Sequence, residues 1–225
     1  MSQHAFKFRG AELIALASGA LYWPAQGLLC VSDLHFGKAQ RFVAQGAAAL
    51  PPYETHDTLL RLDQDITATQ ARTVICLGDS FDSLQAGNDL DDNARSWITR
   101  MQAGRRWIWI EGNHDPGPVG LGGSHQAEHT CDGLVFRHIA DDPACGEISG
   151  HFHPKISLKL KSSRITRRCF AFDERRLVMP AYGTYTGGLS VLKHPLATLL
   201  DDPAICILVG NGSAHAIPRP KTAPT

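Results

Sequence analysis

The stretch "GLLCVSDLH", residues 27–35, runs from a continuous apolar segment into a serine, an aspartate and a histidine. An apolar run without alternation is typical of a strand that is covered on both faces of its sheet. The stretches "RTVICLGDS" (72–80) and "RRWIWIEGNHD" (105–115) repeat this design. Because ligands bind at the carboxyl ends of strands in open α/β sheets, the three polar ends indicate one ligand site.

Helices are predicted between these strands. Residues 53–70 follow two prolines, which favour a helix start, and their leucines form one apolar stripe. Residues 90–104 begin with acidic residues and end with Arg100 and Gly104, which suits the helix dipole and a C-terminal glycine. The first half of the chain therefore reads strand–helix–strand–helix–strand, an α/β pattern.

The second half predicts a mostly antiparallel sheet packed on the first, because short apolar segments alternate with turn residues and leave little room for helix. The candidate strands are 133–138, 147–153, 155–160, 168–172, 189–192 and 205–210. We expect a single domain over 1–225 with a frayed tail at 218–225. Residues 6–23 loosely imitate a signal peptide, but Glu12 interrupts their apolar stretch, so an edge strand or a short amphipathic segment is expected.

Composition narrows the function classes. The chain has 22 lysines and arginines together and 22 aspartates and glutamates together. No basic excess therefore marks a broad nucleic-acid or membrane surface. The six cysteines include no C-x-x-C pair, which favours a reducing, cytoplasmic location without disulfides. No apolar run approaches the about 20 residues of a membrane span. The composition leaves the oligomeric state open.

Histidine is abundant, with 11 copies, and several stand in short clusters at strand ends. In "SGHFHPK" (149–155), an extended backbone would turn His151 and His153 to the same face. Other polar strand ends can meet them, and in chain order the whole set is Asp33-x-His35, Gly78-Asp79, Gly112-Asn113-His114-Asp115, His138 and Gly150-His151-x-His153. Carboxylate, imidazole and amide ligands suit Mn²⁺, Fe²⁺ or Zn²⁺. Two such ions about 3.5–4 Å apart can bridge a hydroxide and clamp a phosphoryl group.

The set resembles the calcineurin-like metallophosphoesterase superfamily, whose pattern is D-x-H, G-D, G-N-H-[D/E], H and G-H-x-H. The resemblance implies an α/β fold in which two mixed β-sheets pack as a sandwich flanked by helices, in four αββα layers. It also implies two divalent ions, with Mn²⁺ expected and Fe²⁺ or Zn²⁺ as alternatives. The implied ligands are Asp33, His35 and His153 for one ion, Asn113, His138 and His151 for the other, and Asp79 as a bridge between them.

Two assignments within this set need argument. His138 is preferred to His125 and His129 as the single-histidine motif, because it ends the apolar strand "GLVF" and lies nearest upstream of the last motif. His114 is the motif histidine that is not a ligand. We expect it to donate a proton to the leaving oxygen, or to stabilise its charge, with Asp115 orienting the ring.

A closer resemblance covers nearly the whole chain. "DLHFGKAQRF", the following "PP", "GHFHP" and "MPAYGTYTGGL" (179–189) look like the ligase-associated DNA-damage-response metallophosphoesterases. These bacterial proteins are linked with a helicase, an ATP-dependent DNA ligase and a nuclease-like partner, which are the partners that the resemblance implies. "QRFVAQG" departs from the pattern where a second arginine is expected.

Substrate contacts are predicted next to the first motif. Lys38 and Arg41 follow it and could meet substrate phosphate, or form a solvated cation pair on a loop. Residues 182–188, "YGTYTGG", could border the site or be a purely structural loop.

The sequence thus predicts a dinuclear-metal-dependent phosphodiesterase or nuclease, with a role in DNA repair. The alternative is a phosphomonoesterase or a small-nucleotide phosphodiesterase on the same metals. A non-catalytic scaffold is disfavoured because no motif residue is missing. With a balanced charge, we expect about two or three phosphate contacts and weak binding of duplex DNA, so that a DNA-directed role relies on partners, ends or single strands.

Overall fold

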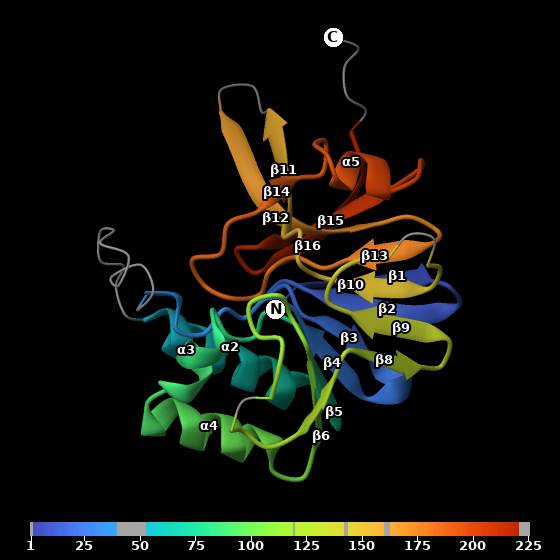
Figure 1. The fold of residues 1–225 in the computed structure, drawn as a ribbon. Helices are drawn as coiled ribbons and strands as arrows, with labels where there is room; N and C mark the ends of the chain where they lie inside the picture. Colours follow the sequence, from blue (N-terminus) through green and yellow to red (C-terminus); the bar gives the residue numbers. More distant parts are fainter. Residues whose placement is uncertain (1, 40–52, 119, 142–143, 160–162, 221–225) are drawn as a thin grey trace.

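Two mixed β-sheets face each other across one apolar core, as Figure 1 shows. The structure is a computed structural model that describes residues 2–39, 53–118, 120–141, 144–159 and 163–220. Most of the tail predicted at 218–225 lies outside these residues. No helix of the described part is long and apolar enough to cross a membrane.

The first sheet has seven strands in chain order. Its first four strands pair antiparallel and β4 to β7 pair parallel. The predicted edge segment 6–23 forms three short antiparallel strands of this sheet. The strands are β1 (Gln3–Phe8), β2 (Ala11–Leu16), β3 (Leu21–Trp23), β4 (Leu28–Val31), β5 (Thr73–Leu77), β6 (Arg106–Ile110) and β7 (Ser124–Gln126).

The second sheet has the order β14-β11-β12-β13-β10-β9-β8, and β15 pairs with β12 and β16. Most of its pairs are antiparallel, as the sequence predicts, but β10 pairs parallel with both β9 and β13, and β11 pairs parallel with β14. The strands are β8 (Glu128–Cys131), β9 (Leu134–Arg137), β10 (Glu147–Ser149), β11 (Pro154–Lys159), β12 (Arg164–Phe172), β13 (Arg176–Val178), β14 (Leu189–Ser190), β15 (Ile205–Gly210) and β16 (Ser213–Pro218).

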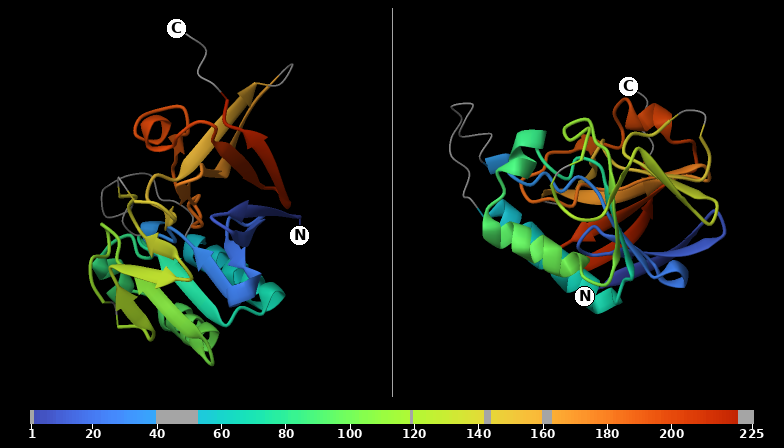
Figure 2. Two further views of the ribbon diagram at one scale, coloured as in Figure 1. Left: turned by 90° about the vertical axis from the view of Figure 1, so that its right-hand side faces the viewer. Right: turned by 60° about the horizontal axis from the view of Figure 1, so that its bottom comes forward.

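Strand β4 shows why the apolar runs carry no alternation. Leu28 and Cys30 pack into the core between the sheets, while Leu29 and Val31 pack into a second core on the opposite face. Helices cover that opposite face, and they lie behind the strands of the first sheet in the left view of Figure 2. They are α2 (Glu54–Thr69) and α4 (Asp92–Gln102), which contact each other, and the short α3 (Leu84–Asn88) lies between them in the chain.

The outer face of the second sheet has a thinner cover. The short helix α5 (Leu196–Leu199) places Leu196 against Ile156 and Cys169 in a third apolar cluster. The predicted fold, two mixed sheets flanked by helices in four layers, is confirmed, with the fourth layer reduced to this helix and its neighbouring segment. A further single turn, η1 (Pro24–Gln26), precedes β4.

Candidate metal centre

The segments after β4 and β5 are paired backbone to backbone. The N–H of Asp33 donates to Gly78 O at 3.2 Å, and the N–H of His35 donates to Asp79 O at 2.9 Å. Asp33, His35 and Asp79 all have φ between 45° and 54°, a left-handed conformation that is uncommon outside glycine. Such residues cost about 1–3 kcal/mol each and persist only where their surroundings hold them. The pairing supplies that support and turns the side chains toward one point beyond the strand ends.

Asp33, His35 and His153 form one ligand cluster, with one ligand atom of each within 4.8 Å of the others. Asp33 Oδ1 lies 2.9 Å from His153 Nε2, and the rings of His35 and His153 meet edge to face. His35 Nε2 is buried and has no hydrogen-bond partner among the described residues. A buried ring nitrogen without a hydrogen-bond partner is costly, so the position of His35 Nε2 fits a metal ligand.

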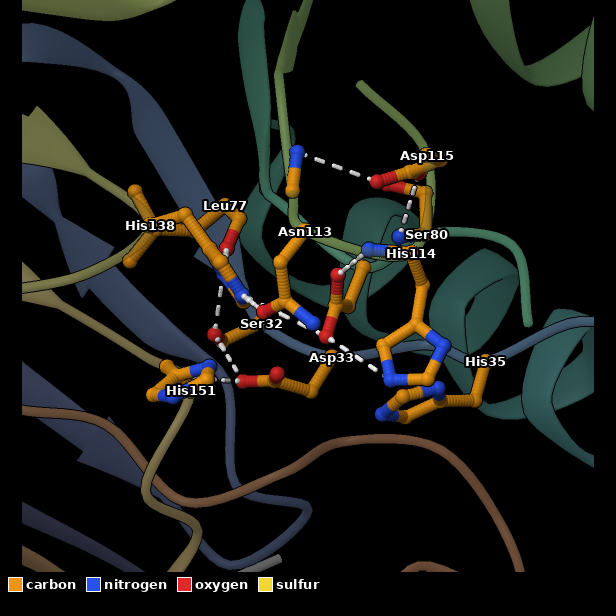
Figure 3. Close-up of polar contacts among 12 residues, drawn as sticks. Ser32, Asp33, His35, Leu77, Ser80, Asn113, His114, Asp115, His138 and His151 are labelled. Carbon is orange, nitrogen blue, oxygen red and sulfur yellow. Dashed lines mark hydrogen bonds and ion pairs between the residues drawn. The ribbon is translucent and has the colours of Figure 1, made fainter. Parts of the chain in front are cut away.

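Asp79, His138 and His151 form a second cluster with the same closeness. His138 Nε2 lies 3.3 Å from Asp79 Oδ2 and 3.1 Å from Asn113 Oδ1. Its Nδ1 lies 3.0 Å from Leu77 O, which can only accept, so Nδ1 carries the proton and Nε2 is free to be a ligand. Figure 3 shows His138 and Asn113 turned toward each other above His151.

The two histidines of "SGHFHPK" belong to different clusters, as the resemblance implies, but the prediction that an extended strand carries them is wrong. β10 ends at Ser149, and His151 and His153 have φ of 66° and 46°. Asp33 Oδ2 accepts a hydrogen bond from the N–H of His151 at 3.1 Å, which ties this turn to the first motif. Gly150 is required here because a Cβ would collide with Ser32 Oγ.

The electrostatics favour cations at this point. Burial raises the pKa of Asp79, but its hydrogen bond and charge interaction with His138 outweigh burial and bring the pKa to about 2. Burial lowers the pKa of His138, but the carboxylates of Asp79 and Asp33 outweigh it and raise the pKa to about 8. The raised pKa of His138 reports the negative charge of the two carboxylates, and the lowered pKa of Asp79 reports its pairing with His138. The donor types, the two clusters and the charge of the carboxylates fit two divalent ions.

His114 lies beside the clusters and belongs to neither. Its ring meets the His35 ring edge to face, and its Nε2 lies 4.0 Å from Asp79 Oδ2. Asp115 does not orient this ring, contrary to the prediction. Its Oδ2 accepts from the N–H groups of Ser80 and Phe81, and its Oδ1 accepts from the N–H of Gly112, so its role is to tie the β6 end to the β5 end.

Asp82 is the residue that sequence reasoning missed. Its carboxylate Oδ1 lies 3.3 Å from His35 Nδ1, and its carbonyl oxygen lies 3.1 Å from His114 Nδ1. It is 1% exposed, and its oxygens face Nδ1 of both rings, where a supporting group can influence the orientation of a ring. The available signal was an acidic residue three positions after Asp79, at the same strand end.

The other predicted residues fall outside the two clusters. His125 stacks on Trp109 within the first sheet, and His129 lies 3.1 Å from Gln126 Oε1. Lys38 is half-buried just beyond the first motif, and Arg41 lies outside the described residues.

Residues 181–189, here called the rim segment, border the centre. The N–H of Tyr182 donates to Ser32 O at 2.7 Å, and the N–H of Gly183 donates to Asp33 O at 3.0 Å. At its other end, the N–H of Leu189 donates to His153 O at 3.1 Å. The 182–188 loop therefore joins both sides of the first cluster.

Known proteins are similar to this chain in sequence pattern and architecture. The profile of the calcineurin-like phosphoesterase family matches residues 28–194. The crystal structure of a nuclease, MPE, from Pseudomonas putida is similar over 96% of this chain and 100% of that chain, with 27% identity and a TM-score of 0.75. A phosphoesterase from E. coli matches over 84% of this chain and 97% of its own, with 10% identity and a TM-score of 0.42. No curated protein matches the sequence.

Proposed function

The chain belongs to the calcineurin-like phosphoesterase family and is a phosphoric ester hydrolase, and from this premise we propose that it is a dinuclear metal-dependent phosphodiesterase that acts as a nuclease. The observation that carries the proposal is the pair of ligand clusters joined through Asp33, with the unliganded imidazole of His114 beside them. The likeness to a nuclease over the whole chain supports a diester substrate.

We assign the ligands by cluster. Asp33, His35 and His153 hold one ion, and His138, His151 and Asn113 hold the other, with Asp79 between them. When bound, two ions supply Lewis acidity toward the phosphoryl oxygens and a water of lowered pKa. We propose Mn²⁺ as the metal because the mixture of carboxylate, amide and imidazole ligands suits it, and Fe²⁺ or Zn²⁺ as alternatives.

We propose that His114 transfers a proton to the leaving oxygen. The Asp82 carbonyl can only accept, so the proton on His114 Nδ1 is fixed and Nε2 is turned toward the clusters. The His114 side chain is 32% exposed, so a substrate can reach it. A protonated Nε2 can then donate to the oxygen that departs from phosphorus.

The test is a substrate panel with purified protein and Mn²⁺. We expect hydrolysis of an aryl phosphodiester and of short DNA in preference to an aryl phosphomonoester and cyclic nucleotides. A chelator should abolish it, and added Mn²⁺ should restore it. Preference for the monoester would instead favour the phosphomonoesterase alternative, and activity that survives chelation would contradict the metal assignment.

A role in DNA repair is the finer part of the proposal. It is supported by the nuclease likeness and by the resemblance of "GHFHP" and "MPAYGTYTGGL" to ligase-associated metallophosphoesterases. The helicase and the ATP-dependent DNA ligase of that group are the partners that we propose. Copurification of either one with the tagged chain from its own host is the measurement that checks this.

A further inference from the structure

The hairpin of β11 and β12 holds an unusual concentration of positive charge. Residues 154–168 contain six of the 22 lysines and arginines of the chain and no aspartate or glutamate. Figures 1 and 2 show the two strands projecting beyond the rest of the second sheet. The zero net charge of the chain conceals this local excess.

The pairing register sorts these charges onto one face. Lys155 pairs with Arg168 and Lys159 pairs with Arg164, and residues directly opposite in an antiparallel pair share a face. Between the two charged pairs lies a hydroxyl pair, with Ser157 Oγ 2.7 Å from Thr166 Oγ1. The other face carries Ile156, Leu158, Ile165 and Arg167. We call the face with Lys155, Ser157, Lys159, Arg164, Thr166 and Arg168 the basic ribbon.

The charges of the basic ribbon are not neutralised within the described part of the chain. None of its four cations forms an ion pair there, and Arg168 donates instead to the carbonyl oxygens of Ala181 and Tyr182. Burial lowers the pKa of Arg168, and the nearby charge of Arg61 lowers it further. Like charges placed directly opposite each other destabilise a sheet. Protection of an exposed edge needs no such cross-strand pairs, so these pairs require another explanation.

The basic ribbon leads to the candidate metal centre. β11 begins at Pro154, the residue after His153. At the inner end, Arg168 holds the rim segment through Ala181 O, and a Cβ on Gly188 would lie 2.6 Å from the Lys155 side chain. The rim segment in turn contacts Asp33 and His153 through its backbone. A chain that follows the cations inward therefore arrives at the ligand clusters.

We propose that the basic ribbon binds the sugar–phosphate backbone of a nucleic-acid strand and guides it to the metal centre. The inference rests on the proposed function, since it names the class of diester that the centre cleaves. The two cation pairs are about 13 Å apart along the strands, which suits a repeating polyanion. Insertion into a lipid surface is favoured by apolar side chains beside the cations, and this face has hydroxyls instead.

Binding is tested with the His114→Ala enzyme loaded with Mn²⁺ and a labelled single DNA strand of about 20 nucleotides, by fluorescence anisotropy across a salt series. Four contacts predict a slope of log affinity on log salt of about −2.8. Adding Lys159→Gln and Arg164→Gln should reduce the slope to about −1.4 and, at about 0.15 M salt, weaken binding about 15-fold. The matched control, Arg167→Gln with Lys7→Gln, removes two charges from outside the ribbon and should change neither quantity.

A second measurement separates this inference from the proposed function. The ribbon variant carries Lys159→Gln and Arg164→Gln with His114 intact. Its ratio of kcat/KM for DNA to kcat/KM for an aryl phosphodiester should fall about 15-fold, and the ratio of the control should not change. If the unaltered enzyme cleaves neither substrate, the proposed function fails. If it cleaves both and the ribbon variant keeps the same ratio, the inference fails alone. The inference also fails if the control loses as much affinity for DNA as the ribbon variant does. It fails likewise if the ribbon variant loses affinity for anionic vesicles and none for DNA.

Discussion

His153 and Pro154 are joined by one peptide bond, and they belong to two regions of opposite character. The metal centre is buried, and the pairing of Asp79 with His138 lowers the pKa of Asp79 and raises that of His138. The basic ribbon begins with β11 and extends to Lys159 and Arg164, which are exposed and have no ion-pair partner in the described chain. One region concentrates negative charge to attract metal ions, and the other concentrates positive charge.

The difference separates two proposed tasks within one chain. In the proposed function the centre acts on a single phosphodiester bond, so its defects must appear with every substrate that has one. The basic ribbon can contact only a substrate that extends beyond the centre, so its defects must depend on substrate length. Variants in the centre should therefore change kcat on every substrate, whereas variants in the basic ribbon should change only the preference for DNA over a small diester.

The largest effect is expected from Asp79→Asn. A neutral amide cannot serve two cations as a carboxylate does, and its loss also leaves His138 without a close anionic partner. We expect both ions to be lost and hydrolysis of an aryl phosphodiester and of DNA to fall below detection, with elemental analysis as the measurement. Asp89→Asn, an exposed change of the same kind, should retain both metals. An Asp79→Asn protein that keeps two ions per chain would show that Asp79 is not shared.

His114→Ala should lower kcat by about 10²–10⁴-fold on both substrates while both metals stay bound. The reason is that His114 lies beside the ligand clusters and contributes no atom to either of them. Steady-state kinetics and metal content are measured on the same preparation. His129→Ala is the control, because that ring contacts Gln126 away from the centre. Loss of a metal in His114→Ala would make this histidine a ligand and remove its role as the acid.

The strand ends of the centre could be predicted from sequence, and the turns that aim the side chains could not. Continuous apolar runs identify β4, β5 and β6, because only a strand covered on both faces lacks alternation. The left-handed φ of His151 and His153 has no sequence signal, since it depends on the hydrogen bond from His151 to Asp33. The same holds for Asp115, whose three N–H donors come from two loops that meet only in the fold.

The basic ribbon was hidden from sequence reasoning for a different reason. Its charges were visible as residues, but the total of 22 against 22 pointed away from a basic surface. Only the register of β11 on β12 shows that Lys155 stands opposite Arg168 on one face, while Arg167 is turned to the other. Charge distribution, rather than charge total, decides whether a strand of nucleic acid can be held.

A smaller effect, confined to the metal centre, is expected from Asp82→Asn. The carboxylate faces His35 Nδ1, and a supporting group of this kind typically changes metal affinity by about 10–100-fold when it is altered. We expect weaker Mn²⁺ binding by titration, with kcat recovered at high Mn²⁺. The preference for DNA over the aryl phosphodiester should stay unchanged, since the basic ribbon is untouched. A changed preference at saturating Mn²⁺ would mean that the two regions are not separate.

The smallest effect concerns the rim segment that joins the two regions. The Tyr182 hydroxyl donates to Asp65 Oδ2 at 2.9 Å, whereas its backbone carries the links to Ser32 O and to the guanidinium of Arg61. Tyr182→Phe deletes only the hydroxyl, so it should lower the free energy of unfolding by about 1.5–3 kcal/mol and retain both metals. Urea denaturation measures the free energy of unfolding. Tyr53→Phe, at a residue that is 69% exposed, is the control and should leave that free energy unchanged. If Tyr182→Phe lost metal instead, the hydroxyl and not the backbone would set the position of the first cluster, and the centre would depend on α2 as well as on the strand ends.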